Sequence, residues 1–374
     1  MNRSQLVKVR EGTTDLMVPA DFCRKGPGRS TEEVFYNRQM EFSRDISVLL
    51  GRIVLKANWR ILDGLAASGA RGLRMAKECG SGGRLFLNDR SHRAAALIRK
   101  NARANDIDDA VVYCRDLGAL LSEESFDYID IDPFGTPVRY VDAAIQSCRN
   151  EGILAVTATD TAPLSGTYPR TCARRYGAIS ARSPFSRETG LRILLGWIAR
   201  EAAKHERGCE PILCFYADHY FRCHVRMRKG ARRADRSLEE LGFAFYDPKT
   251  LQRGIVPQRP SRTSDTLAGP LWVGSLHSPE VLTLMTSDES LGTRRRCEKA
   301  IELWRGEIGA PALYYRVDEL AKHTKRHPPK LSHLVQRLQS SGAHSSRTDF
   351  DPKGFKTDMP IGELIELFEI VSTR

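Results

Sequence analysis

A regular alternation of short apolar runs and amphipathic helical segments fills residues 59–227, and it constrains the fold more than any other feature of the sequence. Strands that alternate with helices form a parallel sheet with helices on its faces, so we expect an α/β protein. The predicted strands are Arg60–Asp63, Leu85–Asn88, Val111–Cys114, Tyr128–Ile131, Gly152–Ala158, Ile212–Tyr216 and Tyr220–Met227. The predicted helices are Ala70–Glu78, His92–Ala104, Val138–Arg149 and Glu188–Lys204.

The segments on either side of this region are less regular. Glu33–Leu50 has helical periodicity. Gly230–Gly274 is rich in Arg, Gly and Pro, and we expect loops and short strands there. The length of 374 residues suits two domains. We therefore predict a catalytic domain with an N-terminal extension over 1–275 and a smaller α+β domain over 276–374.

The second domain is predicted to begin with helices at Pro279–Glu289 and Thr293–Glu307. Two shorter helices follow at Val317–His323 and Pro329–Ser340, and then two strand-like runs meet at a turn over Asp351–Gly354. This order is typical of a winged helix-turn-helix. Such a module binds nucleic acid or serves as a packing unit, and the sequence leaves both open.

Positive charge is clustered along the chain. The 58 Lys and Arg residues exceed the 46 Asp and Glu residues, which gives a net charge of +12. Residues 168–187 contain five arginines and no acid, residues 226–236 contain six basic residues, and residues 322–330 are also basic. Clustering favours a nucleic-acid partner over a merely solvated surface. Arg170, Arg174 and Arg175 are candidates for phosphate contacts.

Several classes of protein are excluded. The longest apolar stretches, such as Gly152–Ala158 and Ile193–Ala199, are far shorter than the roughly 18 residues of a membrane span. The N-terminus lacks the apolar core of a signal peptide, so we expect a cytoplasmic protein. The nine cysteines are scattered without a CxxC pair, and we expect no metal site.

The first strand, turn and helix read ILDGLAASGARGLRMA. Asp63 ends the strand, and glycines relax the turn in front of the helix N-terminus. The GxGxxG spacing of dinucleotide enzymes is absent. A strand-end acid and a looser turn suit S-adenosylmethionine, which has no pyrophosphate. A purely structural turn is the alternative.

The next two strands also end in acids. Asp89 is placed to accept both hydroxyls of a ribose. Asp116 could bind the exocyclic amine of adenine while Leu117 covers the ring. Helix capping is the alternative for both acids. Arg44 and Arg71 are candidates for the methionine carboxylate, because a guanidinium binds a carboxylate through two parallel hydrogen bonds.

The fourth strand ends in FDYIDIDPFGTP, the sharpest signal in the chain. The amine nitrogen of a purine is a poor nucleophile because its lone pair is delocalised into the ring. Asp132 and the Pro133 carbonyl could accept its N–H bonds while Phe134 stacks on the base. Phe35 or Tyr36 could form a second aromatic wall, or belong to ordinary helix packing. An acidic turn beside a buried Phe is the structural alternative.

Together these motifs resemble the archaeal form of the tRNA (guanine-26-N2)-dimethyltransferase family, over nearly the whole chain. The matching stretches are EVFYNRQMEFSRDISVL, ILDGLAASGARGLRMA, IDIDPFGTP, GILAVTATDTAPLSGTYPRTCARRYG, DHYFRCHVRM, AGPLWVGSLH and SSRTDFDPKGFKTDMP. The resemblance implies a class I, Rossmann-like methyltransferase domain, S-adenosylmethionine as the donor, and two successive methylations of a guanine N2 in tRNA. The paired cysteines that some members carry before GPLW are missing here, so no zinc is implied.

The resemblance also implies roles for individual residues. Arg44, Arg71, Asp89 and Asp116 match cofactor positions, Asp132 matches the catalytic acid, and Phe35 and Phe134 match aromatic positions around the target base. Two other functions stay open from the residues alone. One is methylation of adenine N6 in RNA, and the other is RNA binding without catalysis on a methyltransferase scaffold.

Overall fold

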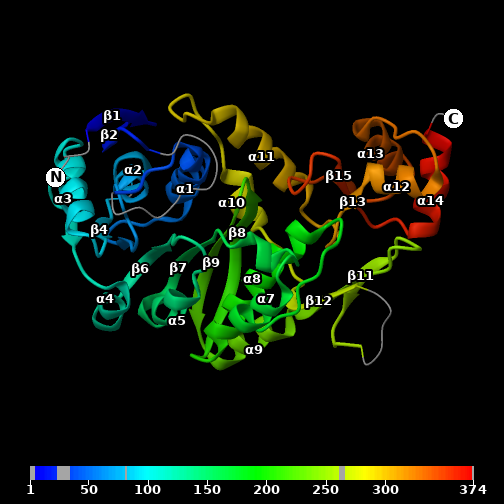
Figure 1. Cartoon of the computed structure of the whole chain (residues 1–374), viewed down its shortest axis with the longest axis horizontal. Helices are drawn as coiled ribbons and strands as arrows, with labels where there is room; N and C mark the ends of the chain where they lie inside the picture. Colours follow the sequence, from blue (N-terminus) through cyan, green and yellow to red (C-terminus); the bar gives the residue numbers. More distant parts are fainter. Residues whose placement is uncertain (1–4, 23–33, 81, 261–265, 373–374) are drawn as a thin grey trace.

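A seven-stranded sheet forms the centre of the computed structural model, which describes residues 5–22, 34–80, 82–260 and 266–372 (Figure 1). The strand order is β5-β4-β3-β6-β7-β9-β8. The first five of these strands are parallel, and β9 runs antiparallel to both β7 and β8. The strands are β3 (Arg60–Asp63), β4 (Arg84–Asn88), β5 (Val111–Tyr113), β6 (Phe126–Ile131), β7 (Cys148–Ala158), β8 (Arg207–Ala217) and β9 (Tyr220–Lys229).

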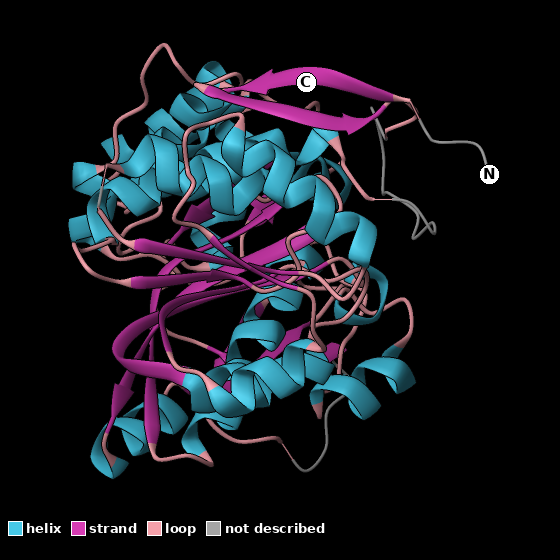
Figure 2. Cartoon of the chain, turned by 90° about the vertical axis from the view of Figure 1, so that its left-hand side faces the viewer, coloured by secondary structure: helices cyan, strands magenta, loops and turns pink. Residues whose placement is uncertain are grey.

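Helices cover both faces of this sheet (Figure 2). Successive side chains of a strand point to opposite faces, so Ile153 and Ala155 pack into one hydrophobic cluster and Leu154 and Val156 into the other. The first cluster includes α1 (Glu41–Val54), α2 (Ala70–Cys79) and α3 (His92–Arg103). The second includes α4 (Leu117–Glu123), α5 (Val138–Ser147) and α8 (Ser186–Ala203). The predicted α/β class, all seven strands and the four helices of this region are confirmed.

The strand order places a crevice at one point of the sheet. From β3 the chain proceeds outward to β4 and β5, and from β6 it proceeds outward in the opposite direction. At such a switch point the two neighbouring loops diverge, one to each face, and open α/β sheets bind ligands there. The loops after β3 and β6 carry the two motifs that the sequence singled out, Asp63 and Asp132.

The N-terminal region differs from the prediction. An unpredicted hairpin of β1 (Leu6–Glu11) and β2 (Thr14–Pro19) packs against α2 and α3. The helix expected over Glu33–Leu50 is wrong at its start, because a 3-10 turn (Arg38–Met40) precedes α1 and residues 34–36 are not helical. The Asn37 side chain accepts a hydrogen bond from the Gln39 amide and so caps the turn. Glu33 lies outside the described residues.

Two further segments were not predicted. After β7 the chain forms α6 (Thr161–Leu164) and α7 (Pro169–Tyr176), and α7 carries the first arginine cluster. The expectation of loops and short strands over Gly230–Gly274 is wrong for α9 (Ala231–Glu239), a short, Arg-rich helix that buries only Ala234 and Ser237. The rest of this segment is a three-stranded sheet of β11 (Arg253–Val256), β10 (Leu241–Tyr246) and β12 (Thr266–Trp272).

The last elements of the chain, residues 315–371, lie at the opposite end of the molecule from α3 (Figure 1). Helices α10 (Pro279–Leu284), shorter than predicted, and α11 (Arg294–Gly306) pack into the cluster that contains α1. A separate cluster holds the last elements. These are β13 (Tyr315–Arg316), α12 (Val317–Thr324), α13 (Leu331–Ser340), β14 (Ser345–Arg347), β15 (Gly354–Thr357) and α14 (Ile361–Val371). Their identity as a winged helix and the domain boundary at 275/276 stay predictions. No helix in the described ranges could cross a membrane.

A buried ion cluster joins this C-terminal part to the central sheet. Lys356 of β15 lies 3.0 Å from Glu188 of α8 and 2.8 Å from Glu307, which directly follows α11. Arg192 also pairs with Glu188, at 3.0 Å. All four side chains are buried, and each carboxylate therefore depends on its cations for the stabilisation that water would otherwise provide.

We expect Lys356→Met to lower the free energy of unfolding by about 3–5 kcal/mol, because it leaves Glu307 buried without its lysine. Urea unfolding followed by circular dichroism would measure this change. The matched control is Lys353→Met, whose side chain is 61% exposed, with an expected change within about 0.5 kcal/mol. Equal effects of both substitutions would contradict the assignment of Lys356 to a buried ion cluster.

Candidate active site

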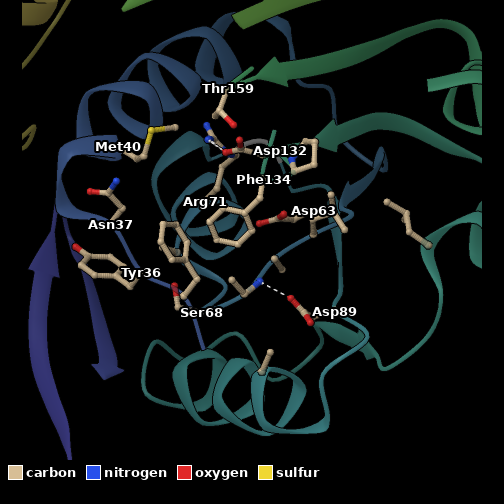
Figure 3. Close-up of a pocket in the computed structure, with 18 of the residues that line it drawn as sticks. Tyr36, Asn37, Met40, Asp63, Ser68, Arg71, Asp89, Asp132, Phe134 and Thr159 are labelled. Carbon is tan, nitrogen blue, oxygen red and sulfur yellow. Dashed lines mark hydrogen bonds and ion pairs between the residues drawn. The ribbon is translucent and has the colours of Figure 1, made fainter. Parts of the chain in front are cut away.

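A cavity of about 960 Å³ opens at the switch point of the sheet. Its walls come from the loops after β3, β4, β5 and β6, from the segment before α1, and from the turn between β8 and β9. Figure 3 shows Asp63, Asp89, Asp132 and Phe134 around it. The lining includes all the residues that the sequence assigned to catalysis and cofactor binding: Phe35, Arg44, Asp63, Arg71, Asp89, Asp116, Leu117, Asp132, Pro133 and Phe134.

The turn between β3 and α2 is held by Asp63. Its Oδ2 accepts a hydrogen bond of 2.9 Å from the Gly72 amide at the start of α2. Gly64 leaves room for a close approach, because a Cβ there would lie only 3.0 Å from the Asp130 carbonyl and from the Leu117 side chain. Burial, together with the negative charge of Asp130, raises the pKa of Asp63 to about 7.

Helix capping was the alternative role for Asp89 and Asp116, and the structure shows that Asp116 caps a helix whereas Asp89 does not. Asp89 accepts hydrogen bonds from the Ala67 amide at 3.0 Å and the Ser91 amide at 2.8 Å, while the cap of α3 is Ser91 itself. Asp116 is the N-cap of α4, and its Oδ1 accepts from the Ala119 amide at 3.3 Å. Both carboxylates nevertheless line the cavity, so capping and ligand binding are compatible.

The loop after β6 presents Asp132 and Phe134. Gly135 has a φ of +77°, and its amide donates to Thr159 Oγ1 at 2.6 Å, which ties the loop to the end of β7. Pro133 is buried, whereas Phe134 is 49% exposed. The rings of Phe35 and Phe134 meet edge to face, with centroids 4.5 Å apart. The structure therefore brings together the two aromatic residues that the sequence selected.

Arg71 connects the functional carboxylates. Its Nη2 donates to Asp132 Oδ2 at 2.5 Å, its Nε lies 3.5 Å from Asp130 Oδ1, and its Nη1 donates to Ser47 Oγ at 2.8 Å. Arg222 of β9 pairs with Asp130 through both Nη atoms. The predicted contact of Arg71 with a cofactor carboxylate stays a prediction, because its donors here serve the protein.

Arg44 is held by an acid that the sequence analysis missed. Glu11 of β1 accepts from Arg44 Nε at 2.7 Å and Nη2 at 2.5 Å, and also from the Tyr36 hydroxyl. Burial raises the pKa of Glu11, but the charges of Arg44 and Arg74 and the hydrogen bonds from Arg44 and Tyr36 lower it below its usual value. Arg44 therefore uses two donor atoms to fix the segment before α1, and its predicted cofactor role stays a prediction. No local signal marks Glu11, because the hairpin itself was not predicted.

Other lining residues were also missed, among them Asn37, Met40, Ser68, His219 and Tyr220. His219 lies in the turn between β8 and β9 and Tyr220 is the first residue of β9, and both belong to the DHYFRCHVRM stretch. That stretch could have identified them, because an antiparallel strand beside β7 starts at the same edge of the sheet where the parallel strands end.

The three arginines assigned to RNA lie outside the cavity lining, on α7. Arg170 and Arg174 are exposed. Arg175 pairs with Asp160 at 3.0 Å, and Asp160 also accepts from the Tyr176 hydroxyl, which lies 2.9 Å from Thr136 Oγ1 in the loop after β6. Helix α7 is thus tied to the loop that carries Asp132, and the role of its arginines in RNA binding stays a prediction.

The lining fits S-adenosylmethionine. Carboxylates at the ends of successive strands can bind its hydroxyl and amino groups, and Leu117 offers an apolar surface. Buried carboxylates also line the cavity, so a positively charged group of a ligand could bind near them. The described residues contain no group of three potential metal ligands.

The chain is similar to known proteins over nearly its whole length. The model of the family described as N2,N2-dimethylguanosine tRNA methyltransferase matches residues 19–369. The chain is 36% identical to the tRNA (guanine(26)-N(2))-dimethyltransferase of Pyrococcus abyssi, over 95% of this chain and 97% of that one. It is 37% identical to the enzyme of the same name from Methanoregula boonei, over 96% and 97% of the two chains.

A solved structure agrees as well. Trm1 from Pyrococcus horikoshii, in complex with S-adenosyl-L-methionine, superposes with a TM-score of 0.87 at 33% identity, covering 99% of this chain and all of that one. The resemblance thus extends from the sheet through the C-terminal elements. By its sequence, its fold and the residues that meet in its cavity, this chain belongs to the N2,N2-dimethylguanosine tRNA methyltransferase family.

Proposed function

We propose that this protein transfers methyl groups from S-adenosylmethionine to the N2 amine of guanine 26 in tRNA, giving N2-methylguanosine and then N2,N2-dimethylguanosine. The observation that carries the proposal is the meeting of two residue sets in one cavity. Asp63, Asp89 and Asp116 follow the strands on one side of the switch point, and the Asp132–Phe134 loop follows the strand on the other.

The cofactor would lie over β3, β4 and β5, where it supplies an electrophilic methyl group. Asp89 would accept the ribose hydroxyls, and its two backbone hydrogen bonds hold the carboxylate in place for them. Asp116 would bind the adenine amine beside Leu117. Arg44 and Arg71 remain the candidates for the carboxylate at the other end of the cofactor, each with part of its guanidinium already used.

Asp132 would act on the target amine. Its carboxylate accepts an N–H hydrogen bond from N2, which favours the pyramidal nitrogen that attacks the methyl group, and then takes the proton that the alkylated nitrogen loses. Arg71 fixes one carboxylate oxygen, so the other remains for the amine. The Pro133 carbonyl would accept the second N–H of an unmethylated guanine.

Phe35 and Phe134 would enclose the base. Their edge-to-face contact fills the space between them, so a guanine enters only when the rings separate and both stack on its faces. Extrusion of a base from a structured RNA costs a few kcal/mol, which stacking on two rings offsets. A half-exposed Phe134 is suited to such a movement.

The two alternative functions have less support. Methylation of adenine N6 would use the same aspartate, proline and aromatic residue, but the relatives are named for guanine 26. A non-catalytic scaffold would not require strand-end acids and an intact Asp-Pro-Phe-Gly loop within one cavity. We also propose that the protein is cytoplasmic and that residues 276–374 help to bind the tRNA.

The direct test is methylation of an unmodified tRNA transcript in parallel with a transcript that carries adenine at position 26. Nucleoside mass spectrometry identifies the product. N2-methylated guanosines only from the guanine transcript would support the proposal, and N6-methyladenosine or transfer to neither transcript would refute it. The ratio of singly to doubly methylated product shows how far the reaction proceeds.

Asp132→Asn tests the acceptor role. The amide keeps the size of the side chain but cannot take a proton, so we expect kcat to fall by about 10²–10⁴-fold. Binding of S-adenosylhomocysteine, measured by calorimetry, should stay unchanged because Arg71 retains Asp130 and Ser47 as partners. Turnover within a few-fold of the wild type would remove Asp132 from the mechanism.

The arginines of α7 are tested by the double substitution Arg170→Ala/Arg174→Ala. We expect a higher KM for tRNA, and a salt dependence of log KM that is shallower by about 0.7–0.9 for each phosphate that no longer pairs with an arginine. Arg232→Ala is the matched control, because this exposed arginine of α9 follows the end of β9 that lies away from the cavity. The same effect in the control would mean that the change is non-specific.

A further inference from the structure

Five charged side chains form a continuous buried cluster beneath the cavity. Asp130 and Asp132 come from the end of β6, Asp63 from the end of β3, Arg71 from α2 and Arg222 from β9. Four of them are nearly inaccessible to solvent, and Asp132 has 21% of its side chain exposed. Three carboxylates face two guanidinium groups. If all five were ionised, the cluster would therefore carry one negative charge that no cation of the protein balances.

Asp63 is the carboxylate left over. Arg222 pairs with Asp130 through two hydrogen bonds, and Arg71 pairs with Asp132 at 2.5 Å and approaches Asp130 at 3.5 Å. Among the described residues Asp63 has no ion pair, and its Oδ2 accepts a hydrogen bond from the Gly72 amide. The Asp63 side chain lines the cavity, so a charged group of a bound ligand can come close enough to interact with its carboxylate.

A buried carboxylate without a counter-charge is costly, and two ways of avoiding this cost are a proton and a bound cation. S-adenosylmethionine carries a positive sulfonium that S-adenosylhomocysteine lacks, while the two molecules share every other charged group. We propose, building on the proposed function, that Asp63 binds a proton in the free enzyme and exchanges it for the sulfonium charge of the methyl donor. The site would then distinguish donor from product by charge.

The exchange balances over a turnover. In the transfer the carbon–sulfur bond breaks with its electron pair left on sulfur, the N2 lone pair forms the carbon–nitrogen bond, and Asp132 receives the proton that N2 loses. The cluster that released one proton when the cation bound thus regains one proton when the cation is consumed. The region beneath the cavity keeps the same total charge in the free, donor-bound and product-bound states.

The direction of the pH dependence follows from the groups that face Asp63. Asp130 and Asp132 of β6 disfavour its ionised form, as does burial, while Arg71 and the Gly72 amide favour it. With the pKa of Asp63 raised to about 7, the proton is bound below about pH 7 and must leave before the cation binds. Affinity for the donor should therefore fall about tenfold for each pH unit below 7. Affinity for S-adenosylhomocysteine should stay constant over the same range.

Isothermal titration calorimetry tests this exchange on the full-length wild-type chain. Titrations at about pH 6 in buffers with different ionisation enthalpies give the number of protons released on binding. We expect close to one proton for S-adenosylmethionine and none for S-adenosylhomocysteine. Equal proton release for the two ligands would overturn the proposal.

The variant Asp63→Asn tests whether the proton released on donor binding comes from Asp63. The amide oxygen still accepts from the Gly72 amide, so the turn is preserved, while the titrating group is removed. We expect proton release to disappear and the affinity for the donor to become independent of pH. Proton release that persists in this variant would also overturn the proposal.

Asp89→Asn is the matched control, since Asp89 lies at the end of the neighbouring strand and is expected to bind the ribose that both ligands share. It should weaken both ligands by the same factor and leave proton release unchanged. Failure of the wild type to bind either ligand would refute the proposed function itself. Normal binding of both ligands without a difference in proton release would refute only the exchange at Asp63.

Discussion

The contact between Arg71 and the carboxylates around it is the interaction on which the site depends. A parallel sheet aligns the ends of its strands, and in this chain those ends carry acids that would repel one another without a cation. Arg71 enters from α2, the helix that follows the first of these strands, and reaches Asp130 and Asp132 on the neighbouring strand. Helix α2, which follows the strand that ends in Asp63, therefore also holds the acids at the end of the neighbouring strand.

Both ends of the chain stabilise this arrangement from outside the sheet. The N-terminal hairpin supplies Glu11, which holds Arg44 and Tyr36 and thereby the segment that presents Phe35. The C-terminal part supplies Lys356, which neutralises Glu188 of α8 and Glu307 at the end of α11. In each case a charge is buried only because its partner arrives from a distant part of the chain, so these contacts form only in the complete fold.

The same distinction explains what the sequence could predict. Asp63, Asp89, Asp116 and Asp132 were identified because each follows an apolar run, and adjacent strand ends in a parallel sheet must meet. Glu11 could not be identified, because it lies 33 residues from Arg44 in the chain and nothing near it marks the pairing. Helix α9 and the Arg-rich α7 were missed for another reason: both are short and rich in arginine, and each buries only two side chains.

The position of the switch point gives the site its chemistry. Strands β3 and β6 are neighbours, with Asp63 paired in register with Asp130, so the strand ends lie about 4.8 Å apart. At that spacing, in a region with little water, a charge on one side of the cavity is strongly felt on the other. In the proposed reaction, positive charge would move from a donor over β3 to a nitrogen over β6, and Asp63 and Asp132, which line the cavity from these two sides, would lie along its path.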